Sequence, residues 1–317
     1  MFFINKNDLE KRFRLLRKEI SIKGISEELR GWNYDQPPIE PPIKEIFFGV
    51  GDLASRYCPT LRDIYLKRIL NIKPPPSLKM VRGIAYHYIS HIVLLNVKKF
   101  LYENSISKIS GAALLDNFLQ KSEDFAIEAV KDAENKIAIL NENDFNTLKN
   151  ECYNFYRFIL IQAASGIDNA ISKFPHADVD TIVNVAIPPI AERKVNGSLI
   201  GLSKELSVDI YAPRNAVADL KTGEIRKFHP YTITGYALAI EADEEISIDY
   251  GLTIYIKNIE NRCLPSLTFK TFIISDELRR EFLEIRDEAI EIVEHGRDPG
   301  KPSICPNYCP YYTVCNK

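Results

Sequence analysis

The change in hydrophobic period near residue 180 constrains the fold most. Before it, apolar residues recur mainly at helical spacing, whereas β-branched segments with a period of two dominate after it. We expect strands in TIVNVAIPP, KELSVDIY, AVADLKTG, DYGLTIYIK and LTFKTFII. A helix, HPYTITGYALAIEAD, interrupts them, and a last helix begins after the N-cap Ser275 and stops at Gly296. This order predicts an α/β fold with a helical front half and a mixed core.

The rest of the chain divides at changes of composition. We expect a helical segment and proline-rich linker over 1–50, a helical region over 51–175, the α/β core over 176–296 and a cysteine-rich tail over 297–317. The net charge of −2 means that a nucleic-acid partner would need a local basic patch. Because the N-terminus is charged and no apolar run could cross a bilayer, we expect a cytoplasmic protein with no membrane partner.

Two acids and a lysine fall on a predicted hairpin, VDIYAPRNAVADLKTGE. Because side chains alternate across a strand, Asp219 and Lys221 share the face opposite Ala218 and Leu220, and Asp209 comes from the neighbouring strand. Two close carboxylates repel unless a cation lies between them, and oxygen ligands suit Mg²⁺ or Mn²⁺. A solvated outer face of the sheet would explain the same pattern without chemistry.

Two further positions add to this cluster. MVRGIAYHYISH places His87 on a helix, with His91 one turn later, a pair that is also compatible with a structural role or half of a zinc site. Glu192 lies beside a strand in PPIAERKVNG, where it could equally be a surface residue.

The combination of R-G-x-x-x-H ending at His87, Asp209, D-L-K at 219–221 and a helix bearing Tyr236 resembles the RecB-like branch of the PD-(D/E)XK nucleases. The resemblance implies a restriction-endonuclease-like core over 176–296. It also implies that His87, Asp209, Asp219 and the main-chain carbonyl of Leu220 hold the metal and that Lys221 is catalytic. Glu192 and Tyr236 are possible accessory residues. The family usually has glutamine four residues before the helix tyrosine, where this chain has Thr232.

Three cysteines crowd the tail in CPNYCPYYTVC, namely Cys305, Cys309 and Cys315, and Cys58 in SRYCPT is a fourth candidate. Four thiolates can hold an iron–sulfur cluster or a structural zinc ion. Cys152 and Cys263 each lie alone in an apolar segment, so we expect them to be buried. A zinc-held structural module would be colourless, whereas an iron–sulfur protein is brown.

One cysteine before the histidine motif and three at the C-terminus is the arrangement of iron–sulfur RecB-like nucleases. The chain resembles the CRISPR-associated exonuclease family Cas four, and within it the archaeal subgroup Csa one, along nearly its whole length, including MFFINKNDLEKR and SRYCPTLRDIYLKR. The resemblance implies an iron–sulfur cluster on Cys58, Cys305, Cys309 and Cys315, 4Fe-4S in preference to 2Fe-2S. It also implies CRISPR integrase proteins as partners.

Basic residues outnumber acids between positions 56 and 82, where Tyr57 and Tyr65 are interleaved. Such a segment can bind phosphates and stack on unpaired bases, or it can simply be a solvated helix face. The residues predicted to bind DNA are Arg56, Arg62, Lys67, Arg68 and Arg82. We therefore expect a metal-dependent DNA exonuclease that trims single-stranded ends during spacer acquisition. The alternative is a non-catalytic DNA-binding or assembly subunit of the same adaptation complex.

Overall fold

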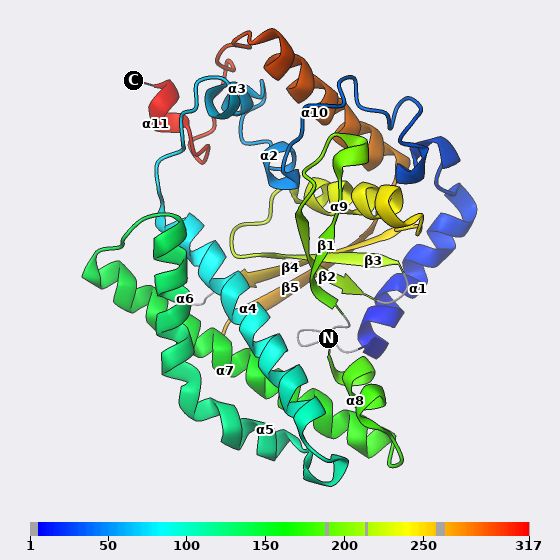
Figure 1. Ribbon diagram of the computed structural model, residues 1–317, viewed down its shortest axis with the longest axis vertical. Coiled ribbons are helices and arrows are strands. Elements are labelled where there is room, and N and C mark those ends of the chain that lie inside the picture. Colours follow the sequence, from blue (N-terminus) through cyan, green and yellow to red (C-terminus); the bar gives the residue numbers. More distant parts are fainter. Residues whose placement is uncertain (1–5, 188–189, 213–214, 258–263, 317) are drawn as a thin grey trace.

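A five-stranded sheet lies at the centre of the computed structural model, which describes residues 6–187, 190–212, 215–257 and 264–316 (Figure 1). Its strands follow chain order: β1 (Ile190–Val195), β2 (Leu206–Ala212), β3 (Ala216–Lys221), β4 (Tyr250–Lys257) and β5 (Ser266–Ile273). Neighbouring strands pair antiparallel except β3 and β4, which are parallel because helix α9 (His229–Glu244) crosses between them. The predicted mixture of helices and sheet is therefore confirmed.

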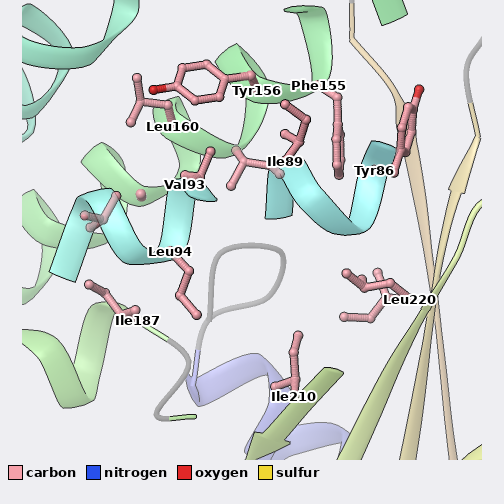
Figure 2. Packing of buried hydrophobic residues seen from close by; sticks show 14 of the residues in the cluster. Tyr86, Ile89, Val93, Leu94, Phe155, Tyr156, Leu160, Ile187, Ile210 and Leu220 are labelled. Carbon is pink, nitrogen blue, oxygen red and sulfur yellow. The ribbon is translucent and has the colours of Figure 1, made fainter. Parts of the chain in front are cut away.

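Five helices, which we call the helical lobe, form most of the core on one face of the sheet: α4 (Leu78–Glu103), α5 (Gly111–Phe118), α6 (Ser122–Lys136), α7 (Glu142–Lys173) and α8 (Val179–Ala186). Figure 2 shows residues of α4 and α7 facing each other within this core. The rings of Tyr86 and Phe155 stack with their centroids 4.5 Å apart. Leu220 of β3 belongs to the same core. This packing fixes α4, and with it His87, against the sheet.

The opposite face is covered by α2 (Val50–Ala54), α9 and α10 (Asp276–His295). Val217 packs in this second core, whereas Ala218 packs in the first, so the side chains of β3 alternate between two buried layers. Helices α9 and α10 meet closely at Gly235, where a Cβ atom would lie 2.5 Å from Cζ of Phe282. Because both faces are covered, the acidic face of the hairpin is not a solvated outer face.

A buried ion-pair network ties the N-terminal segment to this second layer. Glu241 of α9 accepts hydrogen bonds from Arg279 at 2.7 and 2.9 Å and from Arg30 at 2.8 Å. It also accepts from the backbone N–H groups of Gly31 and Ile248, both at 2.9 Å. Both carboxylate oxygens of Glu241 are thus hydrogen-bonded, as a buried charge requires.

The remaining helices are α1 (Lys6–Lys23), α3 (Arg62–Arg68) and α11 (Tyr312–Cys315).

The segment TIVNVAIPP is a departure from the sequence prediction, because most of it forms helix α8 rather than a strand. Asp178 is the N-cap, and its side chain accepts a hydrogen bond from the backbone N–H of Thr181 at 2.8 Å. Ile182, Val183 and Ala186 recur at helical spacing and are buried in the lobe. The β-branched composition suggested a strand, but the N-cap and the helical spacing of the apolar residues favour a helix.

None of the helices in the described ranges is long and apolar enough to cross a membrane.

Candidate active site and cysteine cluster

The structure brings together the four side chains that the motifs predict, from three elements. His87 comes from α4, Asp209 from β2, and Asp219 and Lys221 from the end of β3. Nδ1 of His87 lies 3.4 Å from Oδ1 of Asp209, and Nζ of Lys221 lies 2.9 Å from Oδ2 of Asp219. Positions 122 residues apart in the sequence therefore form one polar cluster at the junction of lobe and sheet.

The strand register explains how the two acids meet. The ladder between β2 and β3 pairs Ile210 with Ala218, so Asp209 and Asp219 are the next positions along their strands. Beyond that pair, the backbone N–H of Leu220 donates a hydrogen bond to a side chain of β2: it bonds to Oδ2 of Asp209 at 3.0 Å. This bond holds the Asp209 carboxylate beside the main chain of Leu220.

Asp219 is the electrostatically unusual member of the cluster. The residue is only 4% exposed, and its Oδ2 atom lies 2.9 Å from Nζ of Lys221, the cation that partners it. Burial raises the pKa of Asp219, Lys221 opposes that rise, and the nearby charge of Asp209 adds to it. Two neighbouring carboxylates, one of them buried, repel each other, and a bound divalent cation would relieve that repulsion.

Lys221 is held between an acid and a hydroxyl. Burial alone would lower its pKa, but the carboxylates of Asp219 and Asp209 outweigh this effect and raise the pKa above its ordinary value. Nζ also donates to Oγ1 of Thr232 on α9 at 3.4 Å. Thr232, which stands where the resemblance predicts a glutamine, therefore contacts the predicted catalytic lysine.

The two accessory predictions have different outcomes. Tyr236 lies on α9. Burial raises the pKa of its hydroxyl, and the nearby charges of Asp209 and Asp219 raise it further. Glu192 lies on β1, but its side chain is outside what the structure describes.

Sequence reasoning missed His229, the first residue of α9, which the fold places beside Lys221. Its Nδ1 atom lies 3.0 Å from the Tyr255 hydroxyl, and Tyr255 pairs with Lys221 in the ladder between β3 and β4. Burial lowers the pKa of His229 to about 4, with the charge of Lys221 as a further cause, so this imidazole is neutral at pH 7. A histidine at the start of a buried helix, eight residues after the lysine, was the available signal.

The donor set at this cluster fits a divalent cation in chemistry. Two carboxylates and an imidazole converge there, and one of the carboxylates, Asp219, is buried. As placed, the side chains in the described ranges include no group of three or more histidines, cysteines, aspartates or glutamates arranged around a common metal position. The fit therefore rests on the residue types and on the burial of Asp219 beside Asp209.

The cysteine-rich tail docks on the segment that follows Cys58. Leu66 of α3 packs with Cys309 and Tyr311 in a small separate core. Oγ1 of Thr60 donates to the carbonyl oxygen of Gly300 at 2.8 Å. The two ends of the chain are thereby joined, as the predicted cluster requires.

Three of the four candidate thiols influence one another. Cys58 and Cys309 are buried, and all four candidates are free thiols. Burial raises the pKa of Cys309 to about 11, with Asp63, Cys58 and Cys305 as further causes. A group of thiols that oppose each other's ionisation fits a bound cationic centre, which would remove that repulsion. Cys152 is buried in the helical lobe as predicted, and Cys263 lies outside the described residues.

Most of the predicted DNA-binding residues have partners within the chain. Arg62 forms a two-pronged pair with Asp298, Lys67 pairs with Asp52, and Arg82 pairs with Glu151 at 2.7 Å. Arg68 donates to the carbonyl oxygen of Phe47 at 2.8 Å. These acids lie outside the segment in which the sequence showed an excess of basic residues. Arg56 has a backbone φ of 34°, in the left-handed region.

Comparison with known proteins agrees with the motifs. The family model described as CRISPR-associated exonuclease Csa1 matches residues 1–317, the whole chain. A protein of Saccharolobus solfataricus named CRISPR-associated exonuclease Csa1 is 33% identical over 323 residues, covering 100% of both chains. A protein of the same name from Thermoproteus tenax is 29% identical over 308 residues, covering 95% of this chain and 96% of its own. The chain belongs to the CRISPR-associated exonuclease Csa1 family.

Proposed function

We propose that this protein is a metal-dependent deoxyribonuclease that trims single-stranded DNA ends while CRISPR arrays acquire new spacers. One observation carries the proposal: the buried Asp219 lies beside Asp209, His87 and Lys221, and these residues converge from the lobe and the sheet. A buried acidic cluster of this kind is costly, and a protein that only bound DNA would not need it. The relatives named exonucleases support the nuclease assignment.

The residues divide into metal-holding and charge-stabilising roles. His87, Asp209, Asp219 and the main-chain carbonyl of Leu220 would hold Mg²⁺ or Mn²⁺. When bound, such an ion polarises a phosphate oxygen and lowers the pKa of water. Lys221 remains a cation at neutral pH because its pKa is raised, so it can stabilise negative charge that develops on the phosphate. Thr232 limits the directions in which Nζ of Lys221 can point.

The tail would hold an iron–sulfur cluster, 4Fe-4S in preference to 2Fe-2S, on Cys58, Cys305, Cys309 and Cys315. The docking of this tail against α3 supports the proposal, because it gathers distant cysteines near one another. By attaching residues near both ends of the chain to one centre, such a cluster would stabilise the second layer beside the catalytic cluster.

DNA binding would involve Arg56, Arg62, Lys67, Arg68 and Arg82, and their intramolecular acids would have to exchange for phosphates. Exposed ion pairs are weak, so that exchange costs little at Lys67, whose side chain is 46% exposed. The other proposed partners are the CRISPR integrase proteins, and the proposed location is the cytoplasm.

End-labelled single and double strands, incubated with and without Mn²⁺, test this function. We expect cleavage of single strands that depends on the metal, and Asp219→Asn should abolish it. Lys221→Ala should reduce the rate by about 100- to 1,000-fold, the usual cost of losing one charge-stabilising group. Asp168→Asn is the matched control, because Asp168 accepts a hydrogen bond within the lobe from the N–H of Gly111. Full cleavage by Asp219→Asn would refute the active site, and wild-type DNA binding without cleavage would instead support the assembly role.

A further inference from the structure

Three aromatic rings that the nuclease chemistry does not use form a continuous path beside the cluster. The Tyr57 ring contacts Phe228 edge-on, with centroids 5.5 Å apart, and contacts Tyr308 at 6.2 Å. Tyr57 directly precedes Cys58, and Tyr308 directly precedes Cys309. The path therefore forms only when the tail is docked on the segment around Cys58.

The outer end of this path carries a cation and is open to solvent. The guanidinium carbon of Arg226 lies 4.1 Å from the centroid of the Tyr308 ring, while Tyr308 is still 39% exposed. Arg226 pairs with Glu224 at 2.6 Å, and that glutamate side chain is 79% exposed, so the ion pair is weak and exchangeable. An aromatic ring stacked with an arginine at a partly exposed position is the chemistry that binds the face of a nucleobase.

The inner end of the path reaches the catalytic lysine. The ring of Phe228 lies 5.2 Å from that of His229, and His229 contacts the hydroxyl of Tyr255, which lies beside Lys221 in the sheet. The three rings therefore extend from residues that pack beside Lys221 to the partly exposed Tyr308. Interior packing alone does not explain the outer end, because it would bury Tyr308.

We propose that Tyr308 and Arg226 form a subsite that stacks with an unpaired base of the DNA strand whose phosphate lies at Lys221. This inference rests on the proposed nuclease function, and it adds the reason for a single-stranded substrate. A paired base has its faces covered by its neighbours, so it cannot use the subsite without unstacking. Stacking accepts every base, so the subsite selects unpaired DNA without selecting sequence.

Binding of a fluorescent single-stranded oligonucleotide and of its abasic counterpart, in EDTA to prevent cleavage, tests the subsite. The abasic strand keeps the phosphates but has no base to stack. We expect wild-type protein to bind the normal strand more tightly by between about five-fold and about a hundred-fold. Tyr308→Ala should remove that preference, Tyr308→Phe should keep it, and Arg226→Gln should reduce it. Tyr312→Ala is the matched control, because Tyr312 is a similarly exposed tyrosine (38%) on the same tail, outside the three-ring path.

The outcomes separate this inference from the function on which it rests. Equal affinity of the wild-type protein for both strands, or an unchanged preference in Tyr308→Ala, overturns the subsite even if the protein cleaves DNA. A base preference that depends on Tyr308 supports the subsite even if no cleavage is found, in which case only the nuclease function fails. Iron content and Tm measured on each variant show whether the tail is docked. If Tyr308→Ala undocks it, the comparison of Arg226→Gln with wild-type protein decides the result.

Discussion

A divalent cation should raise the thermal stability of the metal-free protein, and Asp219→Asn should remove that increase. Burial raises the pKa of Asp219 above its value in the unfolded chain, despite the opposing charge of Lys221. A group with a raised pKa contributes stability that is complete below its unfolded pKa and is lost as the pH rises through its folded pKa. Ionising Asp219 is therefore a cost to the fold, and a divalent cation bound beside this carboxylate would offset that cost.

The size of the effect follows from mass action and from the length of the chain. A ligand that binds only the folded state at 100 times its Kd adds about 2.7 kcal/mol to the free energy of unfolding. The entropy of unfolding is about 2.1 cal/mol/K per residue. For 317 residues, each kcal/mol therefore raises the Tm by about 1.5 °C. We expect Mn²⁺ at 100 times its Kd to raise the Tm by about 4 °C.

Calorimetry under oxygen-free conditions, with and without Mn²⁺, measures this increase for each variant. Asp219→Asn should show an increase of less than about 1 °C, because its neutral amide is a poor ligand for the ion. Asp168→Asn has lost a carboxylate of the lobe, so it can change the Tm itself but should keep the full increase. An increase of about 4 °C in Asp219→Asn, or equal losses in both variants, would show that the ion binds elsewhere.

Three other changes have outcomes that the structure determines. Glu241→Leu should cost about 3–5 kcal/mol of unfolding free energy in urea denaturation, because it leaves the fully buried Arg279 without its partner. Although burial opposes it, Arg279 lowers the pKa of Glu241, so wild-type stability should fall as the pH drops through that pKa and the variant should lack this loss. Gly31→Ala should cost about 1–3 kcal/mol in the same assay, because its methyl group would lie 2.1 Å from a backbone oxygen of α9. Cys58→Ser should abolish bound iron and visible absorption, whereas Cys152→Ser should retain both; equal loss in the two would show that the ligand set is wrong.

The hairpin could be predicted from the sequence because its signals are local. Alternation on β3 fixes which side chains share a face, and the acids and lysine on one hairpin are separated by few residues. His87 needed the family motif, because its position beside Asp209 depends on how α4 packs across the sheet. Periodicity cannot supply a contact of that kind. It depends on a core in which Tyr86 stacks on Phe155, far along the chain.

The basic segment shows a different limit. Counting charges between residues 56 and 82 predicted an unpaired positive surface, but an ion pair can form with an acid from anywhere in the fold. Asp298 reaches Arg62 from 236 positions away, and Glu151 reaches Arg82 from 69 positions away. A local excess of one charge therefore shows which residues could bind phosphate. The fold shows which intramolecular ion pair each of them must break to do so.

The proposed metal ligands come from different parts of the fold, so we expect metal affinity to depend on complete folding. His87 belongs to the helical lobe, and the acids belong to the sheet. No one of these parts holds enough ligands by itself, and Asp219 is buried only when the lobe and α9 enclose the end of β3. An incompletely folded chain would bind the cation weakly and would therefore be unable to cut DNA.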